Sequence, residues 1–123
     1  MAIEQSELAG QIVAAAVTVH KALGPGFLEV VYENALAHEL KKLGLKVEVQ
    51  LEVPVIYDGV EVGKHRLDLF VGEQVVAEVK TVADFSAVHF SVLRSQLRCV
   101  NRAHGVLLNF SKGRLDSKLV TLE

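Results

Sequence analysis

Three ionisable side chains lie in an apolar stretch near the middle of the 123-residue sequence: Asp68, Glu78 and Lys80. Their neighbours are mostly Leu, Phe, Val and Ala, and an unpaired charge is costly in such surroundings. These groups should therefore pair with one another, bind a metal ion or lie at an opening of the core. Two carboxylates beside a lysine suit a hard cation such as Mg²⁺, which takes oxygen ligands. The alternative interpretation is a lysine–carboxylate ion pair on an exposed sheet face.

The spacing of these residues predicts that a hairpin presents them. Gly72-Glu73 reads as a two-residue turn, with the glycine where a type II′ turn needs it. Alternation along the following strand puts Glu78 and Lys80 on one face. In this register Asp68 faces Ala77, so strict pairing puts Asp68 and Glu78 on opposite faces of the sheet. Only a bulge or a splayed strand would bring the two carboxylates together.

The elements that must position this hairpin follow from apolar periodicity and turn residues. Helical spacing predicts helices over 6–23, 27–43 and 86–101, and strands are expected over 47–53, 55–57, 60–71, 74–82, 105–110 and 119–122, with a tight turn at Asp58-Gly59. Pro54 indicates that the first strand lies at an edge or ends there. The order α-α-β-β-β-α-β-β predicts an α/β (α+β) fold. Its mixed sheet has about five strands, contains a three-stranded antiparallel meander and is flanked by helices. The length predicts one domain over 1–123.

Composition excludes several classes of protein. Apolar residues make up 50% of the chain and charged residues 23%, which argues against disorder. A single cysteine, Cys99, excludes an internal disulfide framework, and no two histidines have the i, i+4 spacing of a zinc site. No apolar run is long enough for a membrane helix, and no basic leader precedes an apolar stretch. We therefore expect a cytoplasmic protein with no membrane partner.

Charge is distributed unevenly along the chain. Residues 1–84 hold 7 Lys and Arg against 13 Asp and Glu, whereas residues 85–123 hold 6 against 2. Arg94, Arg98 and Arg102 follow i, i+4, i+8 spacing, which predicts one basic face on the helix 86–101. Arginine forks suit phosphate oxygens, so this face is a candidate nucleic-acid surface. The alternative is an ordinary solvated helix face.

Two motifs resemble a known family. Asp68 followed ten residues later by Glu78-Val-Lys80 is similar to the signature of the PD-(D/E)XK nuclease superfamily. Gly26-Phe-Leu-Glu29-Val-Val-Tyr32 resembles the signature of its GxxExxY branch. The flanking segments His20-Lys-Ala-Leu-Gly-Pro-Gly26 and Leu107-Leu-Asn-Phe110 also look like that branch, and the resemblance spans about residues 10–122 in one collinear order.

The resemblance implies a set of functional residues. Glu29, Asp68 and Glu78 would hold Mg²⁺ or Mn²⁺, and Lys80 would complete the catalytic set. Tyr32, His89 and Gln96 are auxiliary candidates, although His89 could equally cap the helix that it opens. The chain departs from the pattern at two places. Leu67 precedes Asp68 where proline is usual, and Val92 and Gln96 stand where the branch has Gln-x-x-x-Tyr, so that Gln96 is expected to reach the pocket from one turn later.

Three functions are consistent with these patterns. The first is a metal-dependent nuclease that hydrolyses phosphodiester bonds of DNA or RNA through a Mg²⁺-bound water. The second is a catalytically weak or inactive nuclease-fold module that binds nucleic acid or a protein partner. The third is a structural domain that associates through its apolar N-terminal helix. The sequence leaves open a homodimer, the choice between DNA and RNA, and any preference for a target sequence.

Overall fold

The computed structural model describes residues 5–122, and their elements confirm the predicted order. The elements follow one another as α1 (Gln5–Leu23), α2 (Glu29–Lys42), β1 (Val47–Tyr57), β2 (Val60–Val71), β3 (Val75–Lys80), α3 (Ala87–Val100), β4 (His104–Asn109) and β5 (Asp116–Thr121). Each helix and strand lies within a few residues of its predicted bounds, except that β1 runs on through Pro54. No helix among residues 5–122 is long and apolar enough to cross a membrane.

The five strands form one mixed sheet in the order β1-β2-β3-β4-β5. The first three strands are the predicted antiparallel meander. Helix α3 then carries the chain over the sheet, so that β4 runs parallel to β3, and β5 returns antiparallel to β4. Strands β1 and β5 are the edges, which agrees with the prediction that Pro54 lies in an edge strand.

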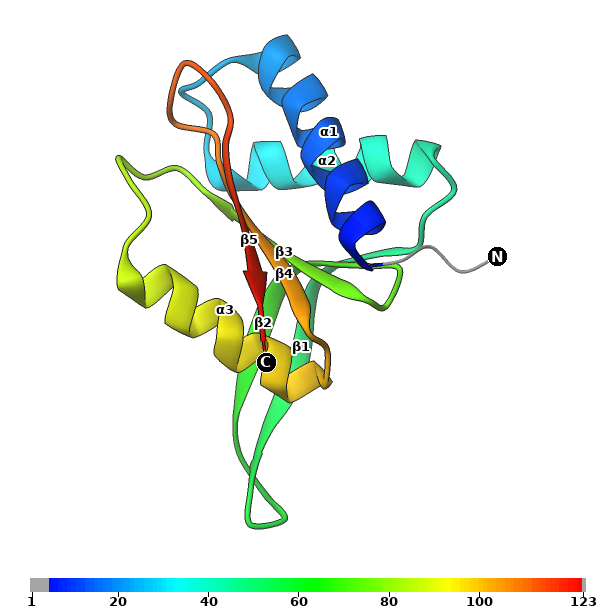
Figure 1. Ribbon diagram of the computed structural model, residues 1–123, viewed down its shortest axis with the longest axis vertical. Coiled ribbons are helices and arrows are strands. Elements are labelled where there is room, and N and C mark those ends of the chain that lie inside the picture. Colours follow the sequence, from blue (N-terminus) through cyan, green and yellow to red (C-terminus); the bar gives the residue numbers. More distant parts are fainter. Residues whose placement is uncertain (1–4, 123) are drawn as a thin grey trace.

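Helices cover both faces of the sheet (Figure 1). On one face, α1 and α2 pack over a cluster that contains Ile12, Leu36 and the strand residues Leu69 and Val79. On the other face, α3 packs over a second cluster, in which its Leu93 and Leu97 meet residues of β1 to β5 such as Leu67. Burial of these two apolar clusters is the main stabilising term of the fold.

Strands β1 and β2 extend beyond the rest of the sheet as a hairpin arm, which we define as residues 53–65 (Figure 1). The predicted turn at the tip is confirmed, because Tyr57 pairs with Val60 across Asp58-Gly59. Both turn residues have positive φ, at 53° and 76°, as a type I′ turn requires.

The predicted turn between β2 and β3 is wrong by one residue. Val71 pairs with Val75 instead of Gln74, so three residues form the loop, and Gly72 and Glu73 both have positive φ. The strands therefore pair one position away from the predicted register. Carried from Leu69↔Ala77 to the next position, the observed register places Asp68 opposite Glu78.

Candidate active site

Asp68 and Glu78 lie together where β2 and β3 separate. Regular pairing of the two strands ends at Leu69 and Ala77. Beyond that point the carboxylates take over the hydrogen bonds that the strands no longer make. The backbone N–H of Asp68 donates to Glu78 Oε2 at 2.9 Å, and the N–H of Val79 donates to Asp68 Oδ2 at 2.9 Å. The observed register thus brings these acids together, and the end of regular strand pairing leaves the two N–H groups free to bind their carboxylates.

The neighbouring strand is also irregular at this level. Gln50 of β1 has a φ of 54°, and the pairing of β1 with β2 skips the position between Val49↔Leu69 and Leu51↔Leu67. Leu69 packs under α1 and α2, whereas Leu67 packs under α3, so the buried side of β2 changes at Asp68. A local distortion of this kind re-aims side chains, and here it directs Asp68 toward its neighbouring strands.

Glu29 joins these acids from the start of α2. It is the first residue of the helix, and its Oε2 accepts a hydrogen bond from the backbone N–H of Thr81 at 3.0 Å. Thr81 directly follows Lys80 at the end of β3. The loop before α2 contains Gly26 with a φ of 112°, a conformation that favours glycine. This loop turns the chain so that the helix begins beside the end of β3.

Glu33 is a fourth carboxylate of the site, which the sequence reasoning missed. It is buried, and its two oxygens accept hydrogen bonds from the Gln50 amide at 2.8 and 2.9 Å. The same amide lies 3.5 Å from Asp68 Oδ1. Glu33 follows Glu29 by one helical turn, and this i, i+4 spacing could have identified it. Nothing in the sequence indicates the positive φ that places Gln50 here.

Lys80 lies on the same strand face as Glu78, as predicted, and its segment is clamped from β4. The backbone N–H of Phe110 donates to the Lys80 carbonyl at 2.9 Å. Fully buried Asn109 then binds the next segment twice: its Oδ1 accepts from the N–H of Val82 at 3.2 Å, and its Nδ2 donates to the Val82 carbonyl at 2.7 Å. These bonds fix the backbone that carries the lysine and Thr81.

Burial and mutual repulsion raise the pKa of the central acids. Burial, followed by the negative charge of Asp68, raises the pKa of Glu78 from 4.5 to about 7. Burial is also the main cause that raises the pKa of Asp68, while the Val79 N–H and the charge of Lys80 lower it. The pKa of Glu33 is raised by burial as well, with further contributions from Asp68 and Glu29. Negative charge is therefore crowded here, and a cation would relieve it.

Gln96 reaches the site from α3, as the sequence led us to expect. It is buried, and its Nε2 donates to Glu78 Oε1 at 3.4 Å. Its own amide oxygen is buried without a hydrogen-bond partner. Val92, one turn earlier, is 39% exposed. The departure from the family pattern thus leaves a polar contact to Glu78, made from a position one turn later.

Two auxiliary candidates point elsewhere. The Tyr32 hydroxyl donates to the Gly24 carbonyl at 2.6 Å and accepts from the N–H of Phe27 at 3.1 Å, so it holds the loop before α2. His89 Nδ1 accepts from the N–H of Ser86 at 3.0 Å, which is a helix-capping contact. Tyr32 therefore acts on the position of Glu29 through the loop, and for His89 the capping alternative fits the observed bond.

The three arginines do not share one helix face. Helix α3 ends at Val100, because Asn101 adopts a left-handed conformation. Arg102 therefore lies beyond the helix, where its Nε donates to the Glu73 carbonyl at 2.7 Å. Arg94 and Arg98 remain exposed on α3. The predicted basic face is thus reduced to two residues.

The acid cluster, which we define as Glu29, Glu33, Asp68 and Glu78, has the donor chemistry of a site for a hard divalent cation. All its ligands would be carboxylate oxygens, which Mg²⁺ and Mn²⁺ prefer. Among the described residues, however, no group of three or more His, Cys, Asp or Glu is already arranged to hold a metal ion. Three of the four carboxylates have an oxygen bonded to a backbone N–H instead. The residues fit such an ion chemically, because each of these three carboxylates has a second oxygen for which no bond to a backbone N–H is seen.

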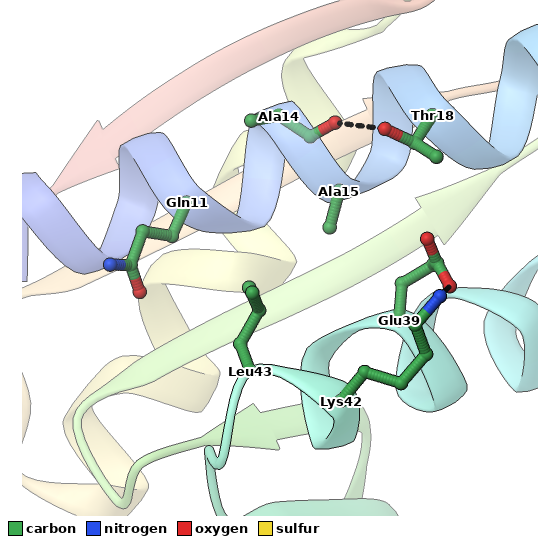
Figure 2. A pocket seen from close by; sticks show the side chains of 7 residues that line it. All are labelled: Gln11, Ala14, Ala15, Thr18, Glu39, Lys42 and Leu43. Carbon is green, nitrogen blue, oxygen red and sulfur yellow. Dashed lines mark hydrogen bonds and ion pairs between the residues drawn. The ribbon is translucent and has the colours of Figure 1, made fainter.

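A second hollow on the surface has fewer free polar groups that could bind a ligand. Figure 2 shows a cavity of about 430 Å³ between α1 and the end of α2, lined in part by Gln11, Thr18 and Leu43. The Thr18 hydroxyl is bonded to the Ala14 carbonyl, and the two charges at the rim, Lys42 and Glu39, pair with each other at 2.8 Å. None of these residues belongs to the acid cluster.

Comparison with known proteins agrees with the fold. The structure of an alkaline exonuclease (LHK-Exo) from Laribacter hongkongensis matches with a TM-score of 0.59 and 11% identity, over 100% of this chain and 73% of that one. The crystal structure of SSO0001 matches with a TM-score of 0.57 and 17% identity over 94% of this chain. The match covers 60% of the SSO0001 chain. Identities this low show a shared fold. No curated protein matches the sequence. The family model of the PD-(D/E)XK nuclease superfamily matches residues 6–121, and the chain therefore belongs to that superfamily.

Proposed function

We propose that this protein is a metal-dependent nuclease that hydrolyses phosphodiester bonds in DNA or RNA. The observation that carries the proposal is the meeting of Asp68 and Glu78 with Lys80 at the point where β2 and β3 separate. Membership of the superfamily and the fold shared with an exonuclease support it. We also propose that the chain belongs to the GxxExxY branch, on the strength of Gly26, Glu29 and Tyr32.

In this proposal Asp68, Glu78 and Glu29 hold a Mg²⁺ or Mn²⁺ ion, and Glu33 adds negative charge beside them. A bound ion of this kind supplies a water of lowered pKa and neutralises phosphate charge. Asp68 and Glu78 must lose their protons to act as ligands, so protons compete with the ion for these carboxylates, whose pKa values are raised. Gln96 positions the Glu78 carboxylate through its amide.

Lys80 has a separate role in the proposal. Its ammonium group would donate hydrogen bonds to a phosphate oxygen as negative charge develops there. The backbone that follows it is held by Phe110 and Asn109, so little reorganisation is needed during the reaction. Arg94 and Arg98, both exposed on α3, would bind the nucleic-acid backbone.

Cleavage of single- and double-stranded DNA and RNA in the presence of Mg²⁺ or Mn²⁺ tests the proposal. We expect the wild type to cleave at least one of these substrates, EDTA to stop it, and Lys80→Ala to reduce the rate by about 100-fold or more. The matched control is Lys42→Ala, which removes an exposed lysine at the end of α2 that pairs with Glu39. Equal rates for the wild type and a Glu78→Ala/Lys80→Ala variant would overturn the proposal.

A second function, binding without cleavage, is favoured by one observation. Among the described residues, no group of three or more His, Cys, Asp or Glu side chains is arranged to hold a metal ion. A module of this kind would bind nucleic acid with an affinity that falls steeply as salt is added. It would not cleave nucleic acid when metal is added, and the wild type and Lys80→Ala would both leave the substrate intact.

A further inference from the structure

A pocket of about 360 Å³ lies between α3 and the hairpin arm. One wall is apolar and comes from the arm, where it is formed by Pro54, Val55 and Ile56. The opposite side is polar and includes Arg98, whose side chain is exposed. The volume is in the range of pockets that bind small organic ligands.

The pocket adjoins the acid cluster through two elements. His65, which lines it, precedes Asp68 by three residues on β2, a distance of about 10 Å along a strand. Ser95, also in the lining, directly precedes Gln96, whose amide bonds to Glu78. A ligand in this pocket would therefore lie beside the acids on the α3 side of the sheet.

Hydrogen bonds in the pocket argue against a nucleophilic role for Ser95. Ser95 Oγ lies 2.9 Å from His65 Nε2, an arrangement that resembles a nucleophile with its base. However, the Ser95 hydroxyl also lies 2.7 Å from the Val92 carbonyl, to which it donates its proton. Ser95 Oγ then accepts a hydrogen bond from the imidazole, so the serine holds the His65 ring in place and is not activated by it.

We infer that this pocket binds one nucleotide of a polynucleotide next to the phosphate that is cleaved. The inference rests on the proposed function. The base packs against the apolar wall and the ring of His65, because nucleobases stack on histidine and apolar side chains. The guanidinium of Arg98 binds the attached phosphate, for which its planar fork is suited. The arm thereby becomes part of the substrate-binding surface.

Binding of a fluorescent single-stranded oligonucleotide, measured by anisotropy in EDTA so that no cleavage is needed, tests this inference. We expect Arg98→Ala to weaken binding about five- to tenfold, and Ile56→Ser to weaken it several-fold. The matched control is Arg66→Ala. Arg66 is exposed, follows His65 on β2 and pairs with Glu52 at 3.5 Å, so its loss should change affinity less than twofold. Equal weakening by Arg98→Ala and Arg66→Ala would overturn the inference.

Cys99, the only cysteine of the chain, lines the same pocket and gives a second readout. The rate at which a thiol reagent modifies it should fall several-fold with saturating oligonucleotide, or with a nucleoside monophosphate at high concentration. Inorganic phosphate that slows modification equally would overturn the inference, because it has no base to fill the apolar wall. An unchanged rate in a chain that cleaves nucleic acid would overturn the pocket alone. Slowed modification in a chain that cleaves nothing would support the pocket and overturn the proposed nuclease.

Discussion

Asp68 and Glu78 each bind the other's strand: the Asp68 N–H donates to the Glu78 carboxylate, and the N–H of Val79, next to Glu78, donates to the Asp68 carboxylate, both at 2.9 Å. The two acids thus replace the strand pairing that ends beside them. Their negative charges also repel each other, and this repulsion, after burial, helps to raise the pKa of Glu78 to about 7. The site is held together by backbone donors against its own electrostatics, which is an arrangement that a cation would stabilise.

The free energy of unfolding should fall as pH rises from about 4.5 to about 7. Glu78 keeps its proton up to about pH 7 in the folded chain, but its ordinary pKa is 4.5. The unfolded chain therefore binds fewer protons in this window, and stability is lost by up to about 3 kcal/mol. Chemical denaturation of Glu78→Gln should show a more stable protein than the wild type at pH 8 and little difference at pH 4.5. The control Glu61→Gln, on the exposed arm, should show the same dependence of unfolding free energy on pH as the wild type. If Glu78→Gln also shows the wild-type dependence, Glu78 does not cause it.

Removal of the Gln96 amide should raise the pKa of Glu78 further, because the hydrogen bond from Gln96 lowers that pKa. In Gln96→Leu the acidic limb of the pH–rate profile should therefore move toward higher pH, by up to about one unit. The rate at the alkaline plateau should change less than the rate at pH 6. Gln11→Leu, at the distant α1–α2 hollow, serves as the control. A loss of rate that is equal at all pH values, with no shift of the acidic limb, would show that Gln96 does not act through the pKa of Glu78.

Loss of the Tyr32 hydroxyl should destabilise the protein by about 1–2 kcal/mol. Tyr32 is fully buried, and Tyr32→Phe leaves the Gly24 carbonyl and the Phe27 N–H without their partner. Tyr57 provides a matched control, because it is 73% exposed at the tip of the arm. Tyr57→Phe should change the free energy of unfolding by less than about 0.5 kcal/mol. If urea denaturation shows the two variants to be equally stable, the loop before α2 does not depend on this hydroxyl.

Close packing of α3 on β4 should make Gly105 intolerant of a side chain. A Cβ at this position would lie 2.9 Å from Leu93 Cδ1, whereas a Cβ at Gly113 would meet nothing within 4 Å. Gly105→Ala should lower the free energy of unfolding by about 1–3 kcal/mol, and Gly113→Ala should leave it nearly unchanged. Thermal unfolding of the two variants checks this. Equal melting temperatures would mean that α3 can shift away from the sheet at little cost.

Most of the fold could be predicted from local signals. Gly24-Pro25-Gly26 separates the first two helices, Asp58-Gly59 forms the tip of the arm, and the helix between β3 and β4 makes those strands parallel. The register of β2 with β3 could not be predicted, because Glu73, a residue with no special preference for positive φ, adopts it at 56°. That one-residue difference decides whether Asp68 faces Ala77 or Glu78.

The candidate site could be predicted only in part, because some of its residues depend on contacts between distant elements. Residue types singled out Asp68, Glu78 and Lys80, because charges among apolar residues must be paired, bound to a metal or placed at an opening, and only the family resemblance added Glu29. Glu33 was missed because a glutamate in a helix is ordinarily a surface residue, and its burial depends on the Gln50 amide of another element. The end of α3 at Asn101 likewise removed Arg102 from the expected helix face.

The proposed nuclease depends on binding of a divalent metal ion by the acid cluster. A crystal soaked in Mn²⁺ at pH 8, where Glu78 is ionised, tests it most directly through the anomalous signal of manganese. We expect a peak bound by Asp68 and Glu78, at about 2.0–2.3 Å from their oxygens, with the N–H groups of Asp68 and Val79 released or shared. The peak should be absent from a Glu78→Gln crystal. A wild-type map with no peak among these carboxylates, at a Mn²⁺ concentration that supports cleavage, would contradict the account.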